Sequence, residues 1–248
     1  MLSLLPAIAR AYRQPRGRGP AAAGFSLIEM LLVIAILTSV MAVVFQQIGL
    51  IQKRASTEEV RLDMMQQARE TMDQMMRDLR NSGYPNSKMY GSGVIVAPVN
   101  NSTYVAAGLV KITNNPPELI FEGDVDGDGQ IDSIRYRQTS TSTESTRCPC
   151  LERSQVTKVT GDPLAGQGTA YHVLVENAAS SGLTFSAYDS NGAVVTIPSG
   201  GLTITSNPST LASIRTIGVA ISVLGKYPDQ QTRQFPAGTV SALARLKN

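Results

Sequence analysis

The 248-residue sequence contains one histidine, two cysteines and no tryptophan. Two cysteines cannot form the several disulfide bonds that hold a small disulfide-rich fold together. The residues needed for nucleophilic catalysis are also scarce, because His172 is the only histidine that a Ser/His/Asp or Cys/His set could use. No glycine-rich loop of the phosphate-binding kind opens a helical segment. We therefore expect that this protein is not an enzyme.

The basic charge of the chain is concentrated at its N-terminus. The sequence has 22 Lys and Arg residues against 19 Asp and Glu residues. Four of the basic residues precede residue 25 and none of the acidic ones does: Arg10, Arg13, Arg16 and Arg18. The rest of the chain has 18 basic and 19 acidic side chains, a net charge of −1 that gives no support for nucleic-acid binding. Arginines ahead of an apolar segment indicate a cytoplasmic N-terminus.

The longest apolar run covers residues 25–45 and contains one charged residue, Glu29. As a helix this run would be roughly 32 Å long, enough to cross the apolar core of a bilayer. A carboxylate at the centre of such a helix costs roughly 2.5 to 3.5 kcal/mol, and less near its end, so Glu29 requires a partner. The small residues 21–24 precede the apolar run, whereas a secretory signal is cut after it. A cut here would leave the apolar helix on the mature chain.

Gly24, Phe25 and Glu29, followed by the apolar run, resemble the cleavage and methylation motif of the type IV pilin and pseudopilin superfamily. The resemblance implies that prepilin peptidase removes residues 1–24 as a leader and that the amine of Phe25 is methylated. It implies that Glu29 docks against the Phe25 amine of a neighbouring pilin or pseudopilin. It also implies a single-pass protein of the bacterial inner membrane, whose C-terminal domain is periplasmic, or extracellular in a pilus. The alternative is an uncleaved anchor whose Glu29 reaches the lipid headgroups.

A helical pattern continues from the apolar run through residues 46–84. Apolar residues recur there at spacings of three and four, which predicts one buried helix face. These residues are Val60, Met64, Ala68, Met72, Met75, Met76 and Leu79. We expect the methionines to fill a core and not to bind a ligand. Gly83 and Pro85 end the pattern, so the sequence predicts one helix from Phe25 to Ser82.

Residues 85–248 predict a β-rich globular domain, because short β-rich runs alternate with turn residues. The predicted strands are residues 94–97, 103–112, 118–122, 131–137, 171–176, 183–188, 193–197, 213–224 and 239–246. Residues 138–168 are rich in Ser, Thr, Gly and Pro and are predicted to form a long loop. The sequence thus predicts an α+β fold in which the amphipathic half of the helix covers an antiparallel sheet. This is also the arrangement of the pilin fold.

Four segments resemble the PilW-like minor pilins and, less specifically, the J-type pseudopilins of type II secretion. They are residues 68–85, 119–137, 175–192 and 239–248. The resemblance implies a minor pilin that helps to prime or cap a type IV pilus, with a type II secretion pseudopilin as the alternative. A membrane-anchored, calcium-binding adhesin or sensor that never enters a filament is a hypothesis from another class.

An acidic segment, residues 124–132, follows the first part of the calcium-binding EF-hand loop, with acidic residues at alternate positions and glycine at the sixth. The predicted ligands are Asp124, Asp126, Asp128, the backbone carbonyl of Gln130, and Asp132. The twelfth position, a glutamate in EF-hands, is Arg135, so Asp132 would supply the missing carboxylate directly or through water. Oxygen ligands suit Ca²⁺, and we expect a strand-loop-strand calcium site. The alternative is a solvated Asp-Gly hairpin without metal.

Cys148 and Cys150 are separated by a single proline. Outside the cytoplasm they would form a small local disulfide loop, with free thiols as the alternative. A zinc site is the least favoured possibility, because His172 is the only histidine that could add a third ligand. His172 lies in a predicted strand, and we expect it to be structural.

Overall fold

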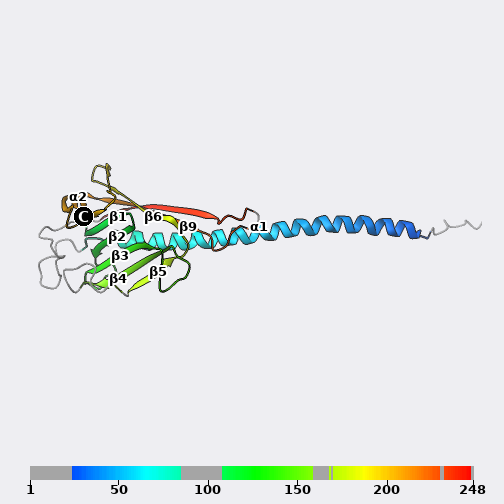
Figure 1. The fold of residues 1–248 in the computed structure, drawn as a ribbon, viewed down its shortest axis with the longest axis horizontal. Coiled ribbons are helices and arrows are strands. Elements are labelled where there is room, and N and C mark those ends of the chain that lie inside the picture. The colour runs from blue at the N-terminus through cyan, green and yellow to red at the C-terminus, as the bar shows by residue number, and fades with distance from the viewer. Residues whose placement is uncertain (1–23, 85–107, 159–167, 169, 230–231, 247–248) are drawn as a thin grey trace, which may run out of the picture. The chain divides into compact units, whose positions relative to one another are not determined.

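The computed structural model describes residues 24–84, 108–158, 168, 170–229 and 232–246. These residues form one long helix, one short helix and two antiparallel sheets (Figure 1). The predicted α+β class, with a long N-terminal helix ahead of antiparallel strands, is confirmed. The chain divides after Ile51 into two units, and the second unit contains both sheets and the later part of the long helix.

Helix α1 spans Leu27–Asn81. Its first turn begins with Ser26, whose carbonyl oxygen accepts hydrogen bonds from the amides of Glu29 and Met30. The helix ends where Gly83 adopts a left-handed conformation with φ of 75°, as helices commonly do. An 18-residue window of α1 has a mean hydropathy of 2.7, so length and composition suffice for a membrane-spanning helix.

The second part of α1 has the buried face that the sequence predicts. All of the predicted residues from Met64 onward are buried, and Val60 is half-buried. They belong to a core shared with strands of both sheets. Because the apolar positions recur every three or four residues, one helix face can be dry while Arg69, Asp73 and Arg77 remain in solvent.

The larger sheet has six strands in the order β5-β4-β3-β2-β1-β8. Its strands are β1 (Leu109–Asn114), β2 (Pro117–Gly123), β3 (Asp132–Thr139), β4 (Cys150–Thr157), β5 (Tyr171–Val175) and β8 (Leu202–Thr203). Neighbouring strands from β1 to β5 are joined in sequence order and all pairs are antiparallel. The β2–β3 connection therefore holds the acidic segment between two hydrogen-bonded strands.

The smaller sheet has four strands in the order β10-β9-β6-β7. These are β6 (Ala178–Tyr188), β7 (Val194–Val195), β9 (Thr216–Leu224) and β10 (Ala237–Arg245). A short helix, α2 (Pro208–Ser213), precedes β9. Asn114 at the end of β1 links the sheets, since its amide bonds both the N–H and the C=O of Phe185 in β6, at 2.7 and 2.9 Å.

The prediction of a long loop at residues 138–168 is wrong in one part. Residues 150–157 form β4, which pairs with β3 over eight positions and with β5 on its other side. The sequence of β4 is mostly polar, but its buried Glu152 is neutralised by Arg137 of β3 at 2.7 Å. Such a strand depends on cross-strand partners that local composition does not reveal.

Most of the other predicted strands are present with shifted ends. Residues 193–197 contribute only Val194–Val195, and the predicted 213–224 strand starts at Thr216, after Ser213 closes α2. The predicted strand at 94–97 and the first part of 103–112 lie outside the described residues.

Candidate functional sites

The predicted cleavage and docking residues lie at the start of α1. Gly24, Phe25 and Glu29 are all exposed, and 76% of Phe25 is accessible. A Cβ added to Gly24 would meet nothing within 4 Å, so no neighbour in this chain demands a glycine there. Within the described part of the chain, the Glu29 carboxylate forms neither an ion pair nor a hydrogen bond.

The apolar half of α1 is uncovered on every side. Each large apolar side chain described from Phe25 to Ile51 is exposed. None of the residues in the 18-residue apolar segment of α1 is buried. A helix that is apolar all round is stable only when lipid or other helices cover it. Glu29 is therefore a carboxylate on a helix that must enter an apolar environment.

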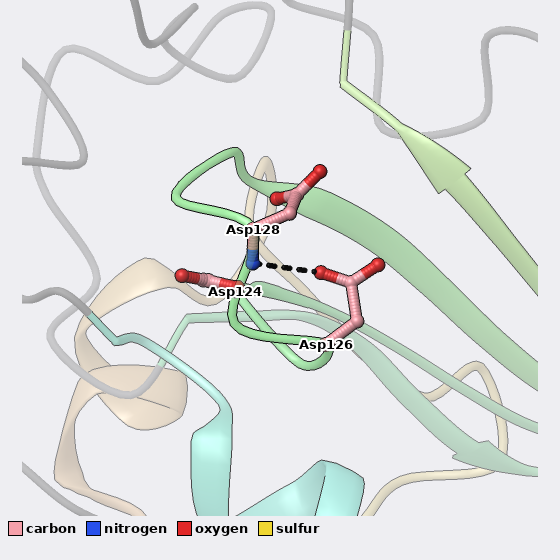
Figure 2. A group of neighbouring side chains, drawn as sticks. All are labelled: Asp124, Asp126 and Asp128. Carbon is pink, nitrogen blue, oxygen red and sulfur yellow. Dashed lines mark hydrogen bonds between the residues drawn. The ribbon is translucent and has the colours of Figure 1, made fainter.

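The acidic segment forms a tight loop between β2 and β3, in which three aspartates converge. Asp124, Asp126 and Asp128 each place one carboxylate oxygen within 4.8 Å of the others (Figure 2). Gly127 and Gly129 have φ angles of 82° and 83°, which glycine adopts without steric cost. The loop therefore turns sharply at both glycines and brings alternate side chains together.

These carboxylates also organise the loop backbone. Asp124 accepts hydrogen bonds from the amides of Gly127 at 2.7 Å and Gly129 at 3.2 Å. The Asp128 amide donates to Asp126 at 3.2 Å (Figure 2), and the Gln130 amide donates to Asp128 at 2.7 Å. A carboxylate oxygen has more than one acceptor site, so these bonds leave the oxygens able to meet a cation.

Asp132, the predicted fourth carboxylate, lies outside this group of three. It begins β3, and its Oδ2 accepts a hydrogen bond from Gln155 Nε2 at 2.8 Å. The same Gln155 amide lies 3.2 Å from Asp126 Oδ2, so it bridges the two carboxylates. Burial, followed by repulsion from Asp126, raises the pKa of Asp132 to about 6. The predicted ligands are thus divided into a triad and a carboxylate linked to it through Gln155.

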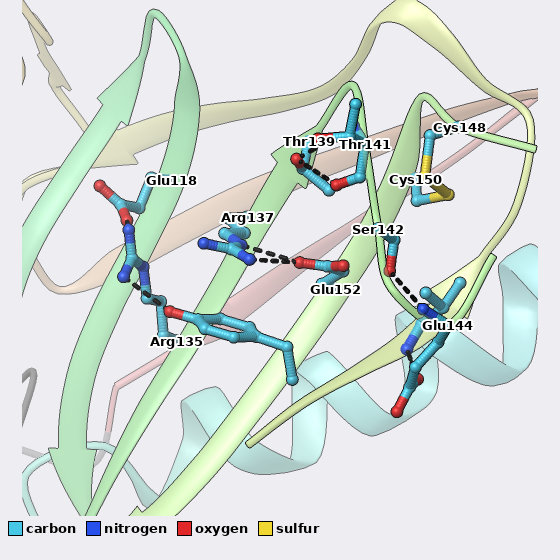
Figure 3. A network of polar contacts seen from close by, with 12 residues as sticks. Glu118, Arg135, Arg137, Thr139, Thr141, Ser142, Glu144, Cys148, Cys150 and Glu152 are labelled. Carbon is cyan, nitrogen blue, oxygen red and sulfur yellow. Dashed lines mark hydrogen bonds and ion pairs between the residues drawn. A yellow bond between two sulfur atoms is a disulfide. The ribbon is translucent and has the colours of Figure 1, made fainter. Parts of the chain in front are cut away.

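The remaining positions of the predicted loop make other contacts. The Gln130 side-chain amide donates to Asp128 Oδ2 at 3.1 Å. Arg135, which replaces the EF-hand glutamate, forms an ion pair with Glu118 and donates to the Tyr171 hydroxyl at 2.6 Å (Figure 3). Arg135 therefore stabilises the outer face of the larger sheet and takes no part in the acidic loop.

A buried ion pair that the sequence analysis did not predict joins α1 to the larger sheet. Asp78 Oδ2 accepts hydrogen bonds from the Tyr136 hydroxyl at 2.6 Å and from Arg153 Nε at 2.8 Å. Arg153 also donates to Gln155 at 2.7 Å, which extends the network to the acidic loop. Burial, together with the Asp78 charge, raises the pKa of Tyr136 well above its usual value. The sequence contained one signal for this ion pair: the acidic Asp78 follows Met75 by three positions and so lies on the helix face that is predicted to be buried.

Cys148 and Cys150 are joined by a disulfide with an S–S distance of 2.14 Å (Figure 3). The carbonyl oxygen of Pro149, between them, accepts a hydrogen bond from the Ala178 amide at 2.7 Å. The small ring therefore holds the beginning of β6 beside the beginning of β4. His172 lies in β5 with an exposed side chain, and its Nδ1 is 3.0 Å from Glu144 Oε1.

Comparison with known proteins identifies the N-terminal segment. Residues 20–45 match the family of the prokaryotic N-terminal methylation motif. Searches of curated proteins and of solved structures returned no match. The matched residues include Gly24, Phe25 and Glu29, and they are followed by the long helix and the antiparallel sheets. The match supports the resemblance of this segment to the type IV pilin and pseudopilin superfamily.

Proposed function

We propose that this protein is a minor pilin-like subunit of a type IV pilus. Prepilin peptidase would cut after Gly24, and the mature subunit would be stored in the inner membrane before it enters or primes the filament. The observation that carries the proposal is the uncovered apolar half of α1, near whose start Glu29 has no ion-pair partner among the described residues. Both features require an apolar environment that contains a partner for a carboxylate.

An ion pair would form the central contact between two docked subunits. Cleavage gives Phe25 a positively charged amine, and the amine of one subunit would pair with Glu29 of its neighbour. An ion pair in apolar surroundings is screened little by water, so it would fix the axial position of one helix against the next. The four leader arginines would place the N-terminus in the cytoplasm, and the second unit, Gln52–Asn248, here called the globular unit, on the far side of the membrane. We propose no catalytic role for this subunit.

N-terminal peptide mass spectrometry tests the processing step. The full-length protein is produced in a host that contains an active prepilin peptidase. We expect a mature chain that begins with methylated Phe25. An intact segment through Arg18 and Gly24, with the peptidase shown to be active on another substrate, would refute the pilin mechanism. That outcome would favour the membrane-anchored adhesin or sensor.

The variant Glu29→Ala tests the docking step. We expect it to enter the membrane as the wild type does but to be depleted from filaments, because the neighbour's amine loses its partner. Glu59→Ala is the matched control, since Glu59 is an exposed glutamate on the same helix beyond the apolar run. Equal amounts of the Glu29→Ala variant and the control in purified filaments would contradict the mechanism.

A type II secretion pseudopilin is the alternative within the superfamily. It would use the same processing and the same helix docking, so neither experiment above separates it from a minor pilin. Deleting the pilus assembly ATPase and, separately, the subunit itself does separate them. Loss of the subunit from surface filaments when the pilus ATPase is deleted identifies the pilus, whereas loss of protein secretion with intact pili when the subunit itself is deleted identifies the secretion system.

We further propose that the acidic loop binds Ca²⁺ and stabilises the globular unit. The convergence of Asp124, Asp126 and Asp128, all oxygen donors, supports this proposal. The full-length protein in detergent is titrated with CaCl₂ while its thermal unfolding is followed. At a free concentration of about 100 times Kd, binding stabilises the folded state by about 2.7 kcal/mol.

Asp126→Asn is expected to abolish this stabilisation. Asp189→Asn is the matched control, because Asp189 caps an exposed turn through the amides of Asn191 and Ala193 at 2.8 Å and lies outside the triad. A melting temperature unchanged at millimolar Ca²⁺, or an equal response in both variants, would rule out the calcium site.

A further inference from the structure

Strand β10 is a long open edge of the smaller sheet. Among the residues that the structure describes, it pairs with β9 alone. The nine residues of β10 follow β9 without any shift of register. A regular strand with one free side presents a row of unpaired backbone donors and acceptors.

The hydrogen bonds at both ends of the β9–β10 pair show which residues face the open side. Gly225 donates its amide to the Pro236 oxygen at 2.7 Å, and Leu246 donates to the Arg215 oxygen at 2.9 Å. In an antiparallel pair the bonding direction alternates along the strand, so even-numbered residues of β10 bond to β9. The odd-numbered residues point their N–H and C=O groups outward. They are Ala237, Thr239, Ser241, Leu243 and Arg245.

The open side of β5, an edge of the larger sheet, is closed by side chains. The Val173 amide donates to Glu144 Oε2 at 2.8 Å, and the Leu174 oxygen accepts a hydrogen bond from Gln67 at 3.0 Å. The other edge strands in the described residues, β7 and β8, have two residues each. These edges are therefore too short or too well covered to add a long strand.

The part of β6 that extends beyond β7 is closed in the same way. Asn114 bonds both backbone groups of Phe185, and Gln138 accepts the Leu183 amide at 3.0 Å and donates to the Ala179 oxygen at 2.7 Å. No side chain in the described part of the chain forms such a bond with the open side of β10.

The composition of β10 also leaves its edge unprotected. Edge strands usually avoid pairing through charged residues, prolines, bulges or short length. From Ala237 to Ala244 the strand has no charged residue and no proline, and its pairing has no bulge. Its even-numbered side chains face the core, where Gly238 lies against Met64 and Met65 of α1. The core therefore holds the strand in place while its outer edge stays available.

The chemistry of this edge defines its partner. Only another extended backbone offers N–H and C=O groups at the repeat of a strand. Arg245, which is exposed, forms no ion pair with any described residue, so an acidic residue opposite it would be favourable. A second copy of β10 contains no carboxylate and cannot supply this pair. Beside the edge, Tyr188, Gly218 and Leu243 line a hollow of about 530 Å³ that has room for an apolar side chain.

We propose that β10 docks an extended strand of a different subunit of the filament, with an acidic residue opposite Arg245. The identity of the partner as a filament subunit rests on the proposed function above. The added strand would extend the smaller sheet across the subunit boundary. The globular unit would then contribute directional hydrogen bonds to an assembly that α1 holds together through apolar contacts.

Amide hydrogen exchange at residue resolution tests the edge directly. In the full-length protein in detergent, the amides of Thr239, Ser241 and Leu243 exchange rapidly, whereas those of Val240, Ala242 and Ala244 are protected. In filaments sheared from producing cells, the three odd-numbered amides become protected as well. Filaments that contain the protein but leave these amides unprotected would overturn the proposal.

Two variants test the partner. Ser241→Pro removes an outward N–H that bonds to none of the described residues, and Arg245→Glu repels an acidic partner strand. Each is expected to reduce incorporation into filaments by about tenfold or more, because one or two interfacial hydrogen bonds or an ion pair are lost. Arg233→Glu, a charge reversal at an exposed position outside β10, should incorporate normally. Normal melting temperatures and protected even-numbered amides show that the variants are folded.

The remaining outcomes are also decisive. A photocrosslinker at Ser241 should label a strand of another filament subunit, and a crosslink between two copies of β10 would refute the assignment of the partner. Wild-type incorporation of both variants would refute the edge itself. If the wild type never enters a filament, neither Glu29→Ala nor Arg245→Glu can change its incorporation. The proposed function then fails, and the partner assignment fails with it. If both β10 variants enter filaments normally while Glu29→Ala does not, the proposal for the β10 edge fails and the filament function stands.

Discussion

Replacing Asp78 by asparagine should destabilise the globular unit, because it leaves the Arg153 charge buried without a counter-ion. The two side chains are 10% and 14% exposed, so water compensates little for the lost partner. Asparagine is close in size to aspartate and keeps an oxygen that accepts the Tyr136 hydroxyl. The substitution therefore isolates the charge and makes no cavity.

The magnitude follows from the burial of the pair. Removing one partner of a buried ion pair typically costs 3 to 5 kcal/mol, and the retained Tyr136 hydrogen bond places the expected loss near the lower end, at about 3 kcal/mol. For a unit of this size, each kcal/mol lowers the melting temperature by about 2 to 4 °C. We expect a decrease of about 6 to 12 °C.

Urea unfolding of the full-length protein in detergent, followed by tyrosine circular dichroism, measures this loss, since the chain has no tryptophan. Asp73→Asn, on the exposed side of the same helix, should change the free energy of unfolding by less than about 0.5 kcal/mol. Adding Arg153→Met to Asp78→Asn should recover at least half of the loss, because the unpaired charge is removed. A loss below about 1 kcal/mol for Asp78→Asn, or strictly additive effects in the double variant, would refute the reasoning.

Substitutions at three further positions have defined outcomes. Gly123→Ala would place a Cβ 2.3 Å from the Asn81 oxygen at the end of α1, and a loss of about 1 to 3 kcal/mol in urea unfolding is expected. Met75→Ala, at a fully buried position, should cost about 2 to 5 kcal/mol, whereas Met75→Leu should cost less than about 1.5. Burial lowers the pKa of Lys158 in the folded chain below 10.5. At pH values just below 10.5 the unfolded chain therefore binds more protons than the folded chain. The free energy of unfolding should therefore rise with pH in that interval, and Lys158→Met should remove the rise.

The long helix α1 and the motif that precedes it were predictable, because the signals for both lie in residues close together in the sequence. An apolar run of helical length, one carboxylate and a preceding glycine are readable from residues 24–45 alone. The buried face of α1 was equally clear, because the spacing of Met64, Ala68, Met72, Met75 and Leu79 matches the helical repeat. Both predictions depend on side chains that share one continuous helix.

Strand β4 was missed because its stability depends on distant partners. Glu152 and Arg153 would be unfavourable in an isolated buried strand, yet Arg137 of β3 pairs with Glu152 and Asp78 of α1 pairs with Arg153. The acidic loop was predicted as a cluster of four carboxylates, and the fold gathers three. Asp132 is separated because it already belongs to β3, where Gln155 of β4 bonds it.

The sequence by itself determined the apolar helix, the processing motif and the convergence of Asp124, Asp126 and Asp128, since each arises from residues close together in the chain. Only the tertiary structure decided which polar residues are buried as partners and which strand edge stays open. Those properties arise from pairing between segments that lie far apart in sequence, such as Asp78 with Arg153 or Asn114 with Phe185. Local patterns of hydropathy and charge carry no record of such pairings, because the same polar residue is favourable or costly according to what the fold places against it.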